Sequence, residues 1–238
     1  INQNDGQTEY YKVKQKYLYD KLDYQIRLAG IRNFSRDPIQ ELLIKIRNNG
    51  QLMGELFNIN QGIITGADKV TKSHIRKYKI NAEIGSGIFV LNKKEISDVY
   101  LNEHDKQILK PWFKNSDINR WYTSVASSED ILYLHRNSRP SKKILNHLST
   151  YKPILKNRRE VVNDIIEWWK LQWPRSESIF LEPKIVVPQR NPKNTFAYND
   201  IPWYASADVY FITSKNNQVS LKYLLALLNS YLYYLWLY

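Results

Sequence analysis

The sequence predicts an α+β fold, with a β-rich first half and a second half that mixes helices and strands. Short apolar or β-branched runs, such as residues 88–91 and 184–187, are separated by polar loops, as is typical of strands. Apolar residues at helical spacing also recur, but without the regular strand–helix alternation that a parallel α/β sheet requires. A chain of 238 residues is long enough to bury one large or two small cores.

The first clear element is a helix that begins after Ser35. Ser35 is a suitable N-cap and Pro38 suits the first turn, while the sequence 48–50 (Asn-Asn-Gly) ends the helical pattern. From residue 55 the apolar spacing becomes that of extended chain. We expect residues 67–78 to form short strands with basic loops, ahead of the apolar run 88–91.

The second half carries three kinds of pattern. Residues 131–134 predict a buried strand, and two stretches predict helices, 141–148 and 154–169. Two β-branched runs, 184–188 and 195–198, predict a hairpin with a polar loop between them, and 209–212 predicts a last strand. Residues 221–238 place leucines at helical spacing. Because Lys222, Asn229 and Ser230 interrupt this stretch, a core helix is favoured over a membrane span.

The charge distribution predicts a polyanionic partner. The formal net charge is +12, and residues 136–159 contain eight basic residues and no acidic one. A long run of one sign repels itself unless a partner supplies the opposite charge, and nucleic acid is the commonest such partner. A solvated, lysine-rich surface is the alternative.

Most catalytic chemistries lack their residues. There is no cysteine, the four histidines are scattered, and no P-loop, Gly-x-Ser-x-Gly elbow or complete methyltransferase glycine loop occurs. Glu182 and Lys184, with Asp164 upstream, superficially match a Mg²⁺-dependent nuclease. However, Pro183 would remove a strand hydrogen bond and Asp164 falls in an expected helix. The abundant aromatic residues raise the alternative of single-stranded RNA binding, but most lie in apolar runs typical of a core.

Recognition chemistry remains. Arginine, glutamine and asparagine can bind base edges, while lysine and arginine neutralise phosphates. Exposed loops and basic segments carry both types. We expect phosphate contacts from Lys69, Lys72, Arg76, Lys77, Lys142, Lys156, Arg158 and Arg159. We expect base readout from Arg120, Arg136, Arg139, Gln189, Arg190 and Asn194.

An ordered set of segments carries a family resemblance. These are 60–69 (Asn-Gln-Gly-Ile-Ile-Thr-Gly-Ala-Asp-Lys), 109–121, 168–175, 183–186 and 224–230, the last ending in Leu-Leu-Asn-Ser. In this order they resemble the TaqI-like C-terminal specificity domain over about residues 35–238. That family forms the target recognition domain of adenine-N6 DNA methyltransferases, including fused type IIG restriction-modification enzymes.

The resemblance implies a DNA methylase specificity domain-like α+β fold, with a β-rich subdomain at about 51–123 and an α+β subdomain at about 124–238. Residues 1–34 would be a connector from a missing catalytic domain. The implied partners are double-stranded DNA and that N-terminal methyltransferase domain, in the cytoplasm and without a membrane. No catalytic, cofactor or metal residue is expected here. S-adenosylmethionine is expected to bind the missing part of the parent enzyme. Whether that part also binds Mg²⁺ or cleaves DNA is left open.

Overall fold

The computed structural model describes residues 2–4, 7–9 and 38–237, and its contacts divide the chain into two units. Unit 1, Ile1–Leu52, contains the short antiparallel strands β1 (Asn2–Asn4) and β2 (Gln7–Glu9) and the helix α2 (Pro38–Asn49). Helix α2 confirms the helix expected after Ser35. Most of the expected connector, residues 1–34, lies outside the described residues.

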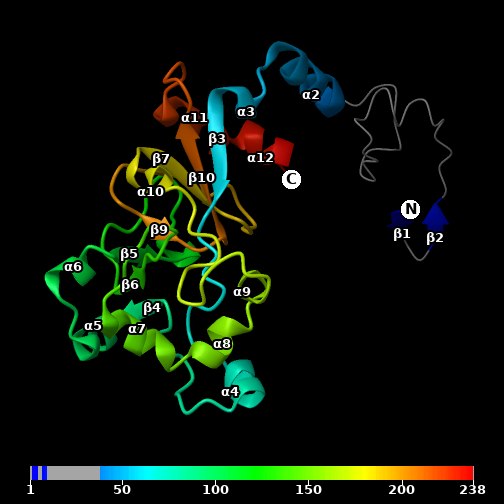
Figure 1. Ribbon diagram of the computed structural model, residues 1–238. Coiled ribbons are helices and arrows are strands. Elements are labelled where there is room, and N and C mark those ends of the chain that lie inside the picture. Colours follow the sequence, from blue (N-terminus) through cyan, green and yellow to red (C-terminus); the bar gives the residue numbers. More distant parts are fainter. Residues whose placement is uncertain (1, 5–6, 10–37, 238) are drawn as a thin grey trace. The chain divides into compact units, whose positions relative to one another are not determined.

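Unit 2, Met53–Tyr238, contains two four-stranded sheets (Figure 1). The first is wholly antiparallel and has the order β3 (Phe57–Gln61), β10 (Val209–Ser214), β7 (Lys184–Pro188), β8 (Ala197–Asn199). Strands β7 and β8 confirm the predicted hairpin. In the central strand, Phe211 lies opposite Asn60 on one side and Val186 on the other.

The second sheet has the order β4 (Val90–Asn92), β6 (Glu129–Leu132), β5 (Leu109–Phe113), β9 (Tyr204–Ala205). Only the β5–β9 pair is parallel. Each sheet therefore combines strands from both sides of the boundary expected near residue 123.

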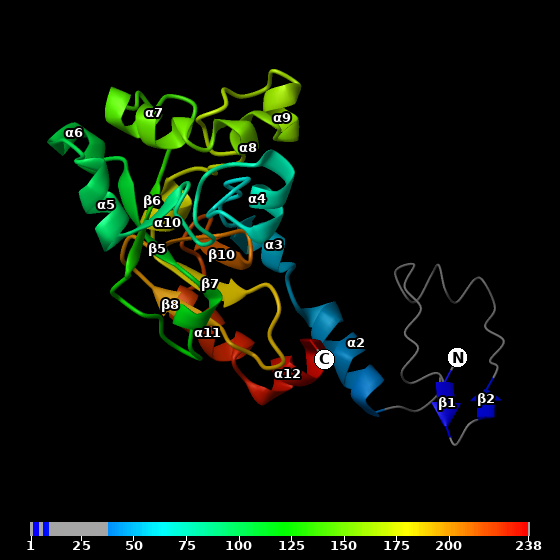
Figure 2. The same cartoon turned by 90° about the horizontal axis from the view of Figure 1, so that it is seen from below.

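Helices surround the sheets and fill the connections between strands (Figures 1 and 2). In chain order they are α3 (Met53–Leu56), α4 (Lys72–Tyr78), α5 (Lys93–Val99), α6 (Glu103–Lys106), the 3-10 helix η2 (Asn115–Asp117), α7 (Lys142–Ser149), α8 (Lys152–Lys156), α9 (Arg159–Val162), α10 (Ser178–Leu181), α11 (Leu221–Leu228) and α12 (Tyr231–Leu237). The predicted helix at 141–148 is confirmed as α7.

Helix α4 corrects the expectation of short strands in residues 67–78. Thr71 and His74 form a reciprocal capping box, in which Thr71 Oγ1 accepts from the His74 N–H at 3.2 Å. His74 Nδ1 in turn accepts from the Thr71 N–H at 3.3 Å. Lys79 then ends the helix in the left-handed conformation, with φ 51°. These caps satisfy orphan backbone groups and make a two-turn helix stable where apolar periodicity is weak.

Two predicted long helices are interrupted. The stretch 154–169 contains the end of α8 and all of α9, and then leaves helical geometry at Asp164, whose φ is 55°. The C-terminal stretch splits into α11 and α12 at Asn229. The Asn229 side chain forms hydrogen bonds with the backbone N–H and carbonyl oxygen of Phe196. Within the described part of the chain, no helix is long and apolar enough to cross a membrane.

Aromatic residues form the centre of the core of unit 2. Phe113 stacks on Trp203 at 4.8 Å between ring centroids, and Phe180 packs edge-on against Phe211. Trp203 and Phe180 are fully buried. A smaller cluster forms where Leu224, Leu225 and Leu228 of α11 pack with β-strand residues, as their helical spacing predicts.

Candidate nucleic-acid interface

Residues 62–64, which lie within the first motif of the resemblance (60–69), cross between the sheets as hydrogen-bonded extended chain. The Ile63 N–H donates to Ala205 O at 2.9 Å, and the Ile64 N–H donates to Trp173 O at 3.0 Å. A side chain at Gly62 would place Cβ 2.2 Å from Ser206 O. The glycine is therefore required by the close approach of two backbones.

A turn at Thr65–Asp68 sets the direction of the chain into α4. Thr65 Oγ1 donates to the Asp68 carboxylate and accepts from the Ala67 N–H at 3.1 Å. The Asp68 carbonyl oxygen accepts from the N–H of Ile88 at 2.9 Å. Burial raises the pKa of Asp68 above its usual value, and the hydrogen bond from Thr65 offsets only part of that rise. This turn is structural, and it positions the basic helix that follows.

Helices α4, α8 and α9 form the most coherent cationic surface, which we call the α4–α8 surface. Helices α4 and α8 contact each other, and Figures 1 and 2 both show them side by side. A hollow of about 510 Å³ lies between them, lined by residues of α4, α8 and α9. Five predicted phosphate contacts are exposed on these helices: Lys72, Arg76, Lys77, Lys156 and Arg159.

Arg158 corrects the expected phosphate set. Its side chain is buried, with the residue only 7% exposed. Its guanidinium donates to three backbone carbonyls: Leu155 at 3.1 Å, Thr65 at 2.8 Å and Trp168 at 2.7 Å. Burial lowers the pKa of Arg158 to about 10. The prediction is wrong for this residue, because its donors already hold the chain together.

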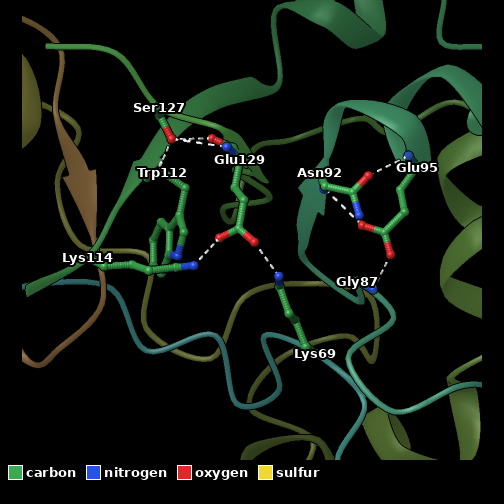
Figure 3. A network of polar contacts seen from close by, with 8 residues as sticks. All are labelled: Lys69, Gly87, Asn92, Glu95, Trp112, Lys114, Ser127 and Glu129. Carbon is green, nitrogen blue, oxygen red and sulfur yellow. Dashed lines mark hydrogen bonds and ion pairs between the residues drawn. The ribbon is translucent and has the colours of Figure 1, made fainter. Parts of the chain in front are cut away.

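Lys69 is engaged by a carboxylate. Figure 3 shows Lys69 and Lys114 approaching Glu129 from two sides, and Lys114 Nζ lies 2.8 Å from Glu129 Oε2. Burial raises the pKa of Glu129, but the hydrogen bonds from Lys114 and Lys69 outweigh it and hold this pKa below its usual value. Lys69 is therefore already paired with the Glu129 carboxylate of the same chain.

Lys142, another predicted phosphate contact, is exposed in the first turn of α7.

The predicted base readers fall into two groups. Gln189 and Arg190 are exposed in the β7–β8 loop, and Arg136 and Arg139 are exposed in the loop after β6. Asn194, by contrast, is 8% exposed, and its Nδ2 donates to Leu228 O at 2.8 Å and Ser230 O at 3.3 Å. The prediction is wrong for Asn194, which ties the β7–β8 loop to the C-terminal helices.

The predicted base reader Arg120 adjoins two exposed aromatic residues that sequence reasoning missed. Arg120 is exposed, but its Nη2 donates to Asn229 O and its guanidinium lies 5.2 Å from the Trp121 ring centroid. Trp121 and Tyr122 are 45% and 63% exposed. Trp121 has φ 86°, a backbone conformation that an aromatic residue does not signal in the sequence.

The nuclease-like constellation does not assemble. Lys184 is fully buried, and its Nζ donates to the carbonyls of Glu182 at 3.0 Å and Ile201 at 2.8 Å. Asp164 follows α9, and Glu182 faces solvent. Among the residues that the structure describes, no group of three or more His, Asp or Glu side chains could hold a metal ion.

The model of the family described as "TaqI-like C-terminal specificity domain" matches residues 68–238. The chain belongs to that family, which confirms the resemblance seen in the sequence segments. A type II methyltransferase, M.BanIII of Aneurinibacillus aneurinilyticus, is 24% identical over 126 residues, covering 48% of this chain and 22% of the relative.

Two solved structures also match. The type IIL restriction-modification enzyme MmeI, solved in complex with DNA, gives a TM-score of 0.51 at 13% identity, covering 76% of this chain and 22% of MmeI. The type IIG restriction endonuclease BpuSI gives a TM-score of 0.42 at 16% identity, with 82% and 22% covered. The likeness to MmeI supports the α+β fold. The chain spans about a fifth of the length of these relatives.

Proposed function

We propose that this chain is the target recognition domain of a DNA adenine-N6 methyltransferase or fused restriction-modification enzyme, and that it binds duplex DNA and reads its sequence. Membership of the specificity-domain family supports this role, and the α4–α8 surface is the observation on this chain that carries it. Methyl transfer, with S-adenosylmethionine and any Mg²⁺, would take place in another part of the parent enzyme.

The α4–α8 surface suits phosphate contacts. Lys72, Arg76 and Lys77 share one short helix, and all three are exposed. Neighbouring phosphates along a strand can each pair with one such cation, and the counterions released add to the affinity. Arg159 has a carboxylate nearby, since its Nη2 lies 3.4 Å from Glu160 Oε1. Because Arg159 is itself highly exposed, a phosphate can still reach it.

Base readout is assigned to the exposed loops. Arg190 and Gln189 extend from the β7–β8 loop, and the rigid β7–β8 hairpin behind them is the kind of scaffold that holds a reading loop in register. The Gln189 N–H donates to Asp208 O at 2.7 Å, which fixes the start of the loop. Arginine can bind guanine bidentately, and glutamine can do so with adenine.

Fluorescence anisotropy of labelled random-sequence duplex DNA across a salt series tests this function. The triple variant Lys72→Ala, Arg76→Ala, Lys77→Ala should weaken binding to all sequences and reduce the log–log salt slope by about 0.9 for each lost phosphate contact. The matched control removes the same charge from exposed lysines on other elements: Lys94→Ala, Lys106→Ala, Lys215→Ala.

The α4–α8 surface is supported if the wild type binds duplex DNA and the first triple variant loses more affinity than the control variant. Equal loss in the two variants would show that only net charge matters. Absence of duplex binding at low salt, or preference for single-stranded RNA used as competitor, would reject the proposed function.

A further inference from the structure

The turn 118–123 is a short hairpin that projects two large aromatic side chains. Ile118 and Thr123 form an isolated antiparallel bridge, and the Asn119 N–H donates to Tyr122 O at 2.9 Å. Between these bonds lie Trp121 and Tyr122, which are 45% and 63% exposed. Two exposed aromatic rings therefore stand side by side at the end of a tight turn, whereas Trp112 and Trp203 are buried in the core.

Trp121 is held in a conformation that its side chain disfavours. Its φ of 86° lies in the left-handed region, where bulky residues are rare. Two backbone bonds to β8 and the residue before it maintain this conformation: the Trp121 N–H donates to Phe196 O at 2.9 Å, and the Tyr198 N–H donates to Trp121 O at 3.1 Å. Such strain persists only where the surroundings over-determine it, and it concentrates at functional sites.

Side-chain hydrogen bonds also hold the base of the turn, at Thr123 and Ser124. Asn199 Nδ2 donates to Thr123 Oγ1 at 2.8 Å, and Trp203 Nε1 donates to Ser124 O at 3.2 Å. Arg120 connects the turn to Asn229, and its guanidinium lies over the Trp121 ring. The rings are therefore presented by a rigid support, and little conformational entropy is left to lose when they bind.

We propose that this aromatic tip, Trp121 and Tyr122, inserts into the base stack of bound duplex DNA and opens a base step. The proposal rests on the proposed function, because it identifies what this part of a DNA reader contacts. Trp121 pairs with Ala197, the first residue of β8, so the tip adjoins the end of the β7–β8 loop, whose first residues are the predicted base readers Gln189 and Arg190.

The chemistry of the tip suits bases better than phosphates. Every base has a flat π-face on which an exposed indole or phenol ring can stack. Proteins that insert such wedges unstack a base step and recover the cost through added contacts. Opening a step costs least where pairing is already weak, so a wedge favours a duplex that contains a mismatch.

The test compares two duplexes of about 30 base pairs that are identical except for one central T·T mismatch, with 2-aminopurine beside it. Trp121→Gly removes the ring and suits φ 86°, so the turn keeps its backbone. Tyr122→Ala removes the second ring. Tyr223→Ala is the control, because Tyr223 is a similarly exposed ring on α11, 60% exposed. Thermal midpoints of all variants check folding.

We expect the wild type to bind the mismatched duplex at least about fivefold more tightly than the matched one and to change 2-aminopurine fluorescence. Trp121→Gly should reduce that preference to within about twofold and abolish the fluorescence change, while Tyr223→Ala keeps both. Wild-type binding without a mismatch preference, or a preference that survives Trp121→Gly, overturns the wedge and leaves the proposed function intact. No duplex binding by the wild type overturns both.

Discussion

Arg158 donates from Nη1 to the carbonyl oxygen of Thr65 at 2.8 Å, and this bond joins the α8–α9 corner to the turn that leads into α4. The same guanidinium bonds Leu155 O and Trp168 O and lies 5.5 Å from the centroid of the Phe89 ring. One buried cation thus fixes several segments that support the α4–α8 surface. Its neighbour Arg159 faces solvent, so adjacent arginines have separate roles.

This division predicts opposite results at the two arginines. Arg158→Met should lower the free energy of unfolding by about 3 kcal/mol or more, because three carbonyls lose a charged donor inside the protein. Arg159→Met should change it by less than about 0.5 kcal/mol. Urea denaturation measures both values. Similar losses in the two variants would contradict a structural role confined to Arg158.

Gly66 faces the same guanidinium and should not tolerate a methyl group. Its φ is 83°, and an added Cβ would lie 2.6 Å from Arg158 Cδ and 2.8 Å from Gln172 Oε1. Gly66→Ala should therefore destabilise unit 2 by about 1–3 kcal/mol. Gly54→Ala is the matched control, since Gly54 lies in α3 with no atom within 4 Å of its Cβ position, and alanine favours the helix. Stabilisation by both substitutions would show that the turn at Gly66 can relax.

Lys184 should make stability depend on pH in the alkaline range. Burial lowers the pKa of Lys184 to about 8, although Asp200 and Glu182 act to raise it. From about pH 8 up to the ordinary lysine pKa, the unfolded chain binds the proton that the folded chain has released, so stability rises with pH. Between pH 7 and 10 the wild type should gain on the order of 2 kcal/mol relative to Lys184→Met. Chemical denaturation at several pH values checks this, and a constant difference would mean that Lys184 stays charged in the fold.

Arg190 and Lys193 should separate base reading from phosphate contact. Both are exposed in the loop between β7 and β8. Arg190→Ala should reduce the discrimination between bases at one position of the site by about 1–3 kcal/mol. Lys193→Ala should lower the affinity for all DNA sequences by the same factor. Selection of bound sites from a random duplex library, followed by affinity measurements on single-base variants, distinguishes the two. Uniform weakening by Arg190→Ala would remove Arg190 from the readers.

The sequence predicts strands and buried helical faces well where local pattern decides the structure. The β7–β8 hairpin and the leucines of α11 are examples, because alternation and helical spacing report burial directly. Helix α4 was missed because it is short: a Thr71–His74 capping box begins it, and Ile75 and Tyr78 pack on the core without forming a long apolar stripe. The break at Asn229 has a local signal in Asn229 and Ser230, and Ser230 Oγ accepts from the Tyr233 N–H at 3.3 Å at the start of α12. The bonds that tie Asn229 to Phe196 have no such signal, because Phe196 is distant in sequence.

The candidate site was predictable only where local sequence pattern reports it. Composition located the basic segments, and the structure places Lys72 and Arg159 on exposed helices. Exposure itself depends on tertiary packing. Arg158, predicted as a phosphate contact, and Asn194, predicted as a base reader, are therefore internal hydrogen-bond donors in the structure. The strained, exposed Trp121 is the reverse case, since aromatic residues in this chain mostly predict a core.

The pairing of β3 with β10 places Ile212 opposite Ile59, so the edge and centre of the first sheet come from distant parts of the chain. During synthesis, β3 leaves the ribosome long before β10, with which it pairs, exists. Strand pairing over such separations is slow, because a long loop must close before any contact forms. An unfinished chain would expose β3 as an unpaired edge, which makes it prone to aggregation and degradation. Synthesis of β10 is therefore the late step that protects the nascent polypeptide.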